Sequence, residues 1–313
     1  MPPPPYFFSY TRLDVVIPFS ATGLVPDAHV SLSFPWAAAI ALGSVLLYAH
    51  LIFSRWPRMY ARQRELCAAK AAVPEPAWAF AHHAALFAYS AFACCAAALH
   101  VAAAGELSLA AFACTPLPAW LRLVSITFTL SKLWEWLDTA VLFARGGSVG
   151  SIGFLHCYHH ATTFLLFLVI QNFPGAEKSG MLLNGFVHTL MYAHYAWRLP
   201  RWARPLITGA QIVQLAAVTA LWAATPALCG GAPAAFARDN PASFLTPFVR
   251  RGQLVFRLAL SLSARAPLTS PSPTPRPPPF RAQALVPVYL LAFLEFFARA
   301  YCCPPKKSKE SGD

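Results

Sequence analysis

Stretches of about 20 mostly apolar residues limit what this chain can fold into, because a helix of that length crosses the hydrocarbon core of a bilayer. They lie at 36–53, 79–103, 119–144, 154–172, 179–198, 205–224 and 284–302. Charged residues make up only 12% of the chain, against about 25% in soluble domains. We therefore predict an all-α fold, a polytopic membrane protein whose seven transmembrane helices form one bundle.

The positions of the basic residues predict how this bundle is oriented. Lys and Arg number 24 and Asp and Glu 12, which gives a formal net charge of +12. Membrane proteins concentrate Lys and Arg in cytoplasmic loops. The loop after the first stretch carries Arg55, Arg58, Arg62, Arg64 and Lys70. We expect a lumenal N-terminus and a cytoplasmic C-terminus, and we interpret the basic charge as topology rather than as a surface for nucleic acid.

The stretch 241–283 differs from the rest of the chain. It contains six arginines and no acidic residue, and it ends in SPSPTPRPPPFRAQ, which cannot form a helix or a packed core. One interpretation is a disordered loop with a basic amphipathic piece near 249–265. We favour the other, which is translated non-coding sequence.

This interpretation divides the chain into five parts. They are a lumenal segment (1–35), a membrane domain with the first six helices (36–240), the atypical insert (241–283), the last helix (284–303) and a basic cytoplasmic tail (304–313).

The eight cysteines include no CxxC pair of the kind that binds zinc. Cys114 and Cys229 fall in loops on the side predicted to be oxidising, where a disulfide between them is one option. Two unbonded thiols are the other, and the sequence leaves both open.

Four polar motifs interrupt the apolar stretches: KLWEWLDT, FLHCYHH, HTLMYAHY and TGAQIVQ. Spacings of three and four residues put the polar side chains of each motif on one helical face. Because successive helices alternate in direction, every motif falls in the middle or the cytoplasmic half of its helix. We therefore predict one site that opens to the cytoplasm and is closed on the other side by apolar helix.

Several chemistries fit such a site. Lys132 and Glu135 could simply pair with each other, and the glutamines of TGAQIVQ could only bridge helices. Three histidines on one helical face favour metal ligation or nucleophile and base chemistry. Membrane di-iron desaturases and hydroxylases also use HxxHH, but they need more histidines in further boxes. A seven-helix receptor or channel would not need a charged face opposite three histidines.

The four motifs, in this order, resemble the signature motifs of the ELO family of very-long-chain fatty acid elongases, which are 3-oxoacyl-CoA synthases of the endoplasmic reticulum. The similarity covers roughly residues 30–240 and resumes at VPVYLLAFLEFFARAY, whereas 241–283 has no counterpart. The resemblance implies condensation of a long-chain acyl-CoA with malonyl-CoA. The product would be a 3-oxoacyl-CoA two carbons longer, formed with release of CO₂ and CoA and without a metal or other cofactor.

The resemblance also assigns roles to the motif residues. His159 would be the acyl-accepting nucleophile, His156 and His160 would orient or deprotonate it, and His188 would assist at the malonyl step. The polar wall that sets their protonation would consist of Lys132, Glu135 and Asp138. The residues expected to bind substrate are Thr139, Tyr192, Tyr195, Gln211 and Gln214. Arg198, Arg201, Arg204 and Arg299 are candidates for the CoA phosphates, although topology alone also explains these charges.

The same resemblance implies the surroundings of the protein. It places a multi-pass protein in the endoplasmic reticulum membrane, in contact with the lipid bilayer. The reductases and the dehydratase of the elongation cycle are the partners that it suggests, and a homodimer is an option that the sequence leaves open.

Overall fold

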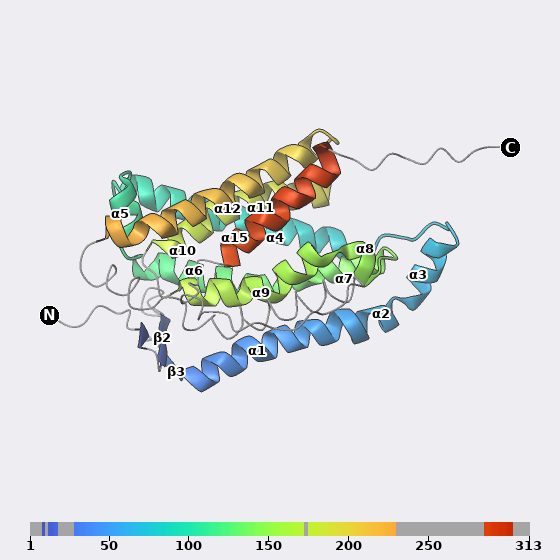
Figure 1. Ribbon diagram of the computed structural model, residues 1–313, viewed down its shortest axis with the longest axis horizontal. Coiled ribbons are helices and arrows are strands. Elements are labelled where there is room, and N and C mark those ends of the chain that lie inside the picture. Colours follow the sequence, from blue (N-terminus) through green and yellow to red (C-terminus); the bar gives the residue numbers. More distant parts are fainter. Residues whose placement is uncertain (1–7, 10–11, 18–27, 172–174, 230–284, 303–313) are drawn as a thin grey trace, which may run out of the picture.

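The computed structural model describes residues 8–9, 12–17, 28–171, 175–229 and 285–302, which form a helical bundle with a small sheet at its N-terminal end (Figure 1). The insert 241–283, the tail 304–313 and most of the segment 1–35 lie outside the described residues.

The sheet precedes the bundle and adds an element to the predicted all-α fold. Its strands are β1 (Phe8–Ser9), β2 (Arg12–Ile17) and β3 (Ala28–Ser33), in the order β1-β2-β3. They are antiparallel, and Leu13 pairs with Leu32 and Val15 with Val30.

The helices follow the predicted apolar stretches. They are α1 (Phe34–His50), α2 (Trp56–Met59), α3 (Ala61–Ala68), α4 (Ala77–Ala103), α5 (Leu109–Cys114), α6 (Ala119–Trp134), α7 (Trp136–Ala144), α8 (Val149–Ile152), α9 (Phe154–Ile170), α10 (Ala176–Ser179), α11 (Gly185–Trp197), α12 (Ala203–Leu228) and α15 (Leu285–Phe297). π-Helical turns occupy Leu51–Arg55, Gly180–Asn184 and Ala298–Cys302. Each predicted stretch coincides with one helix or with helical pieces joined end to end.

One helix of the described chain, α4, is by its own length and composition able to cross a membrane, with 27 residues. A single helix of this kind is weak support for a membrane protein. Other predicted spans are divided along their length, the first by the π-helical turn after His50 and the third at Glu135. The count of seven spans stays a prediction.

Two apolar clusters hold the helices together. The larger joins α4, α6, α9, α12 and α15 and includes Ala97, Leu121, Phe128, Phe167, Leu215 and Tyr289, all buried. The smaller fixes α1 against α7 through Tyr48, Ile52, Trp56, Trp136 and Phe143. Both clusters lie beside the polar motifs, so apolar packing sets the distances between those motifs.

Two glycines allow backbones to approach closely beside α11. A Cβ atom at Gly185 would lie 3.1 Å from the carbonyl oxygen of Ser90 on α4. Gly175 has a φ of +81°, and a Cβ there would lie 2.2 Å from the carbonyl oxygen of Ala113. Any larger residue at Gly175 would be strained and would collide with backbone. These contacts set the position of the segment that enters α11.

The end of the bundle away from the motifs, where we predict that apolar helix closes the site, also contains buried ion pairs. Arg122 donates to Glu177 at 3.0 Å, and Lys178 donates to Glu106 at 2.5 Å. All four side chains are buried. The paired residues are 55 and 72 positions apart in sequence, and a buried charge is tolerated when it is paired.

A disulfide joins Cys114, at the end of α5, to Cys229, just after α12. Their Cα atoms are 5.4 Å apart, and 115 positions separate them in sequence. Lys178 lies at the same end of the bundle, with its Nζ atom 5.5 Å from the ring centre of Phe112.

Candidate active site

The polar motifs surround a cavity of about 1440 Å³. The predicted site residues in its lining are Asp138, His156, His159, His160, His188, Tyr195, Arg198, Arg201, Arg204, Gln211 and Gln214. The three arginines are exposed, so the cavity reaches the surface at a basic rim. The structure therefore brings all four motifs to one place.

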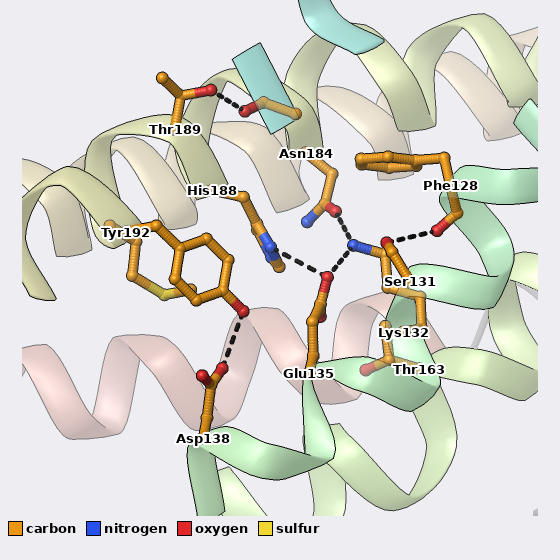
Figure 2. Close-up of polar contacts among 12 residues, drawn as sticks. Phe128, Ser131, Lys132, Glu135, Asp138, Thr163, Asn184, His188, Thr189 and Tyr192 are labelled. Atoms are coloured by element: carbon orange, nitrogen blue, oxygen red, sulfur yellow. Dashed lines mark hydrogen bonds and ion pairs between the residues drawn. The ribbon is translucent and has the colours of Figure 1, made fainter. Parts of the chain in front are cut away.

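Lys132 is the centre of a buried polar group between the first and third motifs (Figure 2). Its Nζ atom donates to Glu135 Oε1 at 2.6 Å and to Asn184 Oδ1 at 2.9 Å. His188 Nδ1 lies 3.3 Å from the same Glu135 oxygen. The π-helical turn before α11 ends at Asn184, and such turns often occur at functional sites. The predicted polar wall thus contacts His188 directly.

Asp138 receives hydrogen bonds at both carboxylate oxygens. Tyr192 donates its hydroxyl proton to Oδ2 at 2.7 Å (Figure 2), and His82 Nε2 lies 2.8 Å from Oδ1. Trp134 Nε1 donates to His82 Nδ1 at 3.0 Å. Since an indole nitrogen only donates, His82 Nδ1 must accept, and in a neutral ring Nε2 then carries the proton. His82 therefore donates to Asp138, which is held in a fixed orientation.

The proton on His82 Nε2 decides whether His82, His83 and Asp138 can together hold a metal ion. Ligand atoms of His82, His83 and Asp138 lie within 4.8 Å of one another, which is close enough for shared ligation. A histidine nitrogen binds a metal through its lone pair, but His82 Nε2 carries a proton in this arrangement. The hydrogen bond from Trp134 thus makes His82 a poor ligand, and these residues do not fit a metal as they are arranged.

The first and second motifs are joined through Thr139. Its Oγ1 atom lies 2.9 Å from His156 Nε2 and 2.8 Å from the hydroxyl of Tyr48, on α1. The Tyr48 ring packs on Trp136 and stacks at 6.4 Å on His160. The position of His156 therefore depends on α1, a helix that contains none of the four motifs.

His159 differs from its neighbour His156. Its Nδ1 atom is buried and has no hydrogen-bond partner among the described residues. Its ring contacts Tyr289 at 5.1 Å and Phe293 at 6.4 Å between centres, both on the last helix. His160 lies 4.3 Å from His156, ring centre to ring centre. Within the described residues, His159 thus packs against aromatic rings and keeps one buried ring nitrogen without a hydrogen bond.

The third and fourth motifs contact each other in the wall of the cavity. Gln211 donates to the sulfur of Met191 at 3.9 Å, a weak contact. The ring of His188 packs edge-on against Tyr192 at 5.6 Å. Tyr195 is 40% exposed and lines the cavity.

Thr139 and Tyr192 are corrections to the predicted set of substrate contacts. Both side chains are fully buried, and neither belongs to the cavity lining of the described residues. They contact His156 and Asp138 instead. Helical spacing identified the face correctly, but it could not show that other side chains cover these two. The side chain of Arg299 lies outside the described residues.

Sequence reasoning missed the partners of the motif residues, which are Tyr48, His82, Trp134, Asn184 and Tyr289. The adjacent polar pair His82–His83 inside an apolar helix was a usable signal. No comparable signal marks a tyrosine in an apolar helix, since its ring packs as a hydrophobic side chain.

Comparison with known proteins places this site in a family. The ELO model, described as the GNS1/SUR4 family, matches residues 36–309. Very long chain fatty acid elongase 2 of Rattus norvegicus is 37% identical over 95 residues, which cover 28% of this chain and 34% of that protein. Putative fatty acid elongase 4 of Caenorhabditis elegans is 36% identical over 109 residues, covering 31% and 35%. Very long chain fatty acid elongase 5 of Mus musculus is 35% identical over 95 residues, covering 28% and 31%.

The matched region spans about a third of the length of these curated relatives. The family match is far longer, since it extends over more than half of the sequence and includes every helix that lines the cavity. The chain therefore belongs to the ELO (GNS1/SUR4) family.

Proposed function

We propose that this protein is a fatty acid elongase that condenses a long-chain acyl-CoA with malonyl-CoA to give a 3-oxoacyl-CoA two carbons longer. Family membership and the names of the relatives, which are fatty acid elongases, support fatty acid elongation in general. The observation that carries the specific reaction is the cavity, which combines an unpartnered buried imidazole with further histidines and a basic rim.

The proposed reaction proceeds in two halves. A ring nitrogen of His159 attacks the thioester carbonyl of the acyl-CoA, and the carbon–sulfur bond breaks. The departing CoA thiolate takes up the N–H proton that the acylated imidazole loses. Malonyl-CoA then loses CO₂, and the resulting carbanion attacks the acyl-imidazole carbonyl. A carbon–carbon bond forms and the carbon–nitrogen bond breaks. The departing imidazolate takes up one proton from solvent, which regenerates neutral His159. A covalent intermediate of this kind splits one difficult step into two easier ones, and neither half needs a metal or redox cofactor.

The neighbouring groups support this chemistry by holding their positions. Thr139 fixes the ring of His156, which lies in the same motif as the nucleophile. Lys132 and Glu135 hold His188 at the cavity wall, where it can polarise the malonyl thioester. Gln211 and Gln214 also line the cavity and are candidate contacts for the substrate. Positioned groups of this kind contribute about 10²–10⁴-fold to proton-transfer steps.

We also propose a multi-pass location in the endoplasmic reticulum membrane, with the N-terminus lumenal and the C-terminus cytoplasmic. The basic rim would then face the cytoplasm, where acyl-CoA is found. The reductases and the dehydratase that complete the elongation cycle are the partners this reaction requires, because its product still carries a 3-oxo group. A homodimer is compatible with this arrangement.

Incubation with acyl-CoA and no malonyl-CoA tests the proposal. Purified protein should release about one CoA per active site and retain an acyl group on His159, detected by mass spectrometry of peptides. The adduct should disappear when malonyl-CoA is added. His159→Ala should abolish both acylation and condensation, whereas His50→Ala, at an exposed histidine of α1, should leave both unchanged.

Two results would contradict the mechanism in different ways. If the His159→Ala protein still forms an adduct, another side chain is the nucleophile. If the wild type condenses normally without forming any adduct, the carbanion attacks acyl-CoA directly and the histidines only polarise and position it.

A further inference from the structure

The rim of the cavity contains an ion-pair group that the proposed reaction does not use. Glu75 lies in the segment between α3 and α4, and its two carboxylate oxygens accept from two arginines, Oε1 from Arg145 and Oε2 from Arg198. Arg145 follows α7 and Arg198 follows α11. One carboxylate therefore links three separate segments at the cavity entrance. All three residues belong to the cavity lining.

The backbone holds the two arginines in place. Each is the C-terminal cap of its helix, where the helix dipole favours a positive charge. Arg198 has a φ of +51°, which is uncommon for a residue with a side chain. Its amide nitrogen bonds His194 O at 2.9 Å, which fixes this conformation. The guanidinium groups therefore converge on Glu75 from rigid helix ends.

The rim carries more positive than negative charge, so it favours binding of an anion. Four arginines line the cavity, Arg145, Arg198, Arg201 and Arg204, against the exposed carboxylates Glu75 and Glu295. The arginines lower the pKa of Glu75, with the hydrogen bond from Arg145 as the main cause. The carboxylate is therefore ionised at neutral pH, and it occupies a place that suits an anionic ligand.

We propose that Glu75 occupies a phosphate-binding site and competes with the ligand for it. The ligand would be a phosphate of the CoA thioester, so this inference rests on the proposed function. A phosphate monoester carries a charge of about −1.5 to −2 at neutral pH and has three acceptor oxygens, against one charge and two oxygens for a carboxylate. It would displace Glu75 from Arg145 and Arg198, while the free carboxylate returns to water.

The strength of this competition follows from the exposure of the pairs. Side-chain exposure is 35% for Glu75, 41% for Arg145 and 79% for Arg198. Exposed ion pairs contribute little each, so two of them favour the occupied form by roughly 2- to 30-fold. A ligand can overcome a bias of that size, and removal of Glu75 should improve CoA binding by the same factor.

Direct binding of CoA to the full-length protein tests this independently of turnover. Calorimetry should show that Glu75→Gln binds CoA roughly 2- to 30-fold more tightly than the wild type. Arg145→Gln should bind CoA more weakly. Pantetheine, which has no phosphate, should not distinguish the three proteins. Glu65→Gln is the matched control, because it removes one exposed negative charge from α3 without touching the cavity lining, and it should behave like the wild type.

Anionic lipid headgroups carry the same phosphate chemistry, so the titrations are repeated in two kinds of nanodisc. In phosphatidylcholine alone, Glu75→Gln should keep its advantage for CoA. If phosphatidic acid removes that advantage, the site is occupied by a lipid headgroup, and the assignment to CoA is wrong.

Other results would also overturn the inference. Equal CoA affinity for the wild type and Glu75→Gln, weaker CoA binding by Glu75→Gln, or no binding of CoA at all would each show that Glu75 only connects the segments. Tighter CoA binding by Glu75→Gln without any condensation activity would instead leave the phosphate site standing and refute the proposed function.

Discussion

The buried pair formed by Lys132 and Glu135 allows a quantitative prediction about stability. Lys132 Nζ lies 2.6 Å from the Glu135 carboxylate and 2.9 Å from Asn184 Oδ1, and its side chain is 0% exposed. The ammonium also lies 4.2 Å from the ring centre of Phe128. Lys132→Met keeps the length of the side chain and removes the charge.

The expected loss of unfolding free energy comes mainly from Glu135, whose buried carboxylate remains after Lys132 is replaced. After the substitution, the carboxylate of Glu135, which is 2% exposed, keeps one ion-pair contact within the described residues, with His188 at 3.3 Å. Leaving one member of a buried ion pair uncompensated costs about 3–5 kcal/mol. Since domains are stable by only about 5–15 kcal/mol, this loss is large but need not prevent folding.

Denaturant unfolding in detergent micelles, followed by tryptophan fluorescence, measures the change in unfolding free energy. Lys132→Met should lose about 3–5 kcal/mol. The double variant Lys132→Met/Glu135→Leu removes both charges, so it should recover most of that loss even though both residues are replaced. Condensation should stay impaired in both variants. In Lys132→Met, the ammonium beside the Glu135–His188 contact is missing, and in the double variant His188 also loses its contact with the Glu135 carboxylate. The double variant should therefore regain most of its stability without regaining condensation activity.

The exposed pair at the rim supplies the matched control. Arg145→Met breaks the contact with Glu75 at side chains that are 41% and 35% exposed, so its cost should be at most about 1 kcal/mol. The reasoning fails if Lys132→Met costs no more than Arg145→Met. It also fails if the double variant is less stable than the single one, because the two charges would then not be coupled as a buried pair.

Four further predictions follow from other contacts. Tyr48→Phe should cost about 1 kcal/mol of stability and slow acylation less than tenfold, measured by CoA release, because His156 keeps its threonine partner. His82→Leu should cost about 1–3 kcal/mol, whereas His82→Gln should cost less, because an amide can both accept from the tryptophan and donate to the aspartate; equal losses would refute the assigned tautomer. Condensation should survive strong chelators, and activity lost to a chelator and restored by iron would return the di-iron interpretation. Cys114→Ser should lower the unfolding free energy by up to about 4–5 kcal/mol, the chain-entropy value for a loop of this length; no change on substitution or on adding reductant would mean free thiols.

The sequence predicted the parts of the site that lie within one helix. Lys132 and Glu135 are three residues apart, so their contact follows from helical geometry alone. His156 and His160 are four apart and do lie together. The alternation of helix direction also predicted that the four motifs meet. Each of these inferences uses only the period of a helix and the fixed direction of the chain.

Contacts between helices could not be predicted in the same way. The bond between Tyr48 and Thr139 spans 91 residues, and that between His82 and Asp138 spans 56. Both depend on how far each helix is rotated about its axis, which is set by apolar packing and by close approaches such as that at Gly185. A rotation by one residue would move a side chain by about 100° around the helix. The pattern of apolar residues in these stretches does not determine rotation that finely.

The pattern of satisfied hydrogen bonds bears on which imidazole of the second motif reacts. Acylation of a ring nitrogen removes any hydrogen bond that this nitrogen makes, and an interrupted buried bond costs about 1–3 kcal/mol. His156 acylated at Nε2 would lose its bond to Thr139, and Thr139 would then keep only Tyr48. His159 has a buried Nδ1 atom that makes no such bond within the described chain, so it can be acylated there without this cost. If the proposed acyl-histidine route holds, we expect the network of Tyr48 and Thr139 to keep His156 in place as an auxiliary group and His159 to be the better acyl acceptor. Mapping of the adduct to His156 rather than to His159 would show that hydrogen bonding does not make this choice.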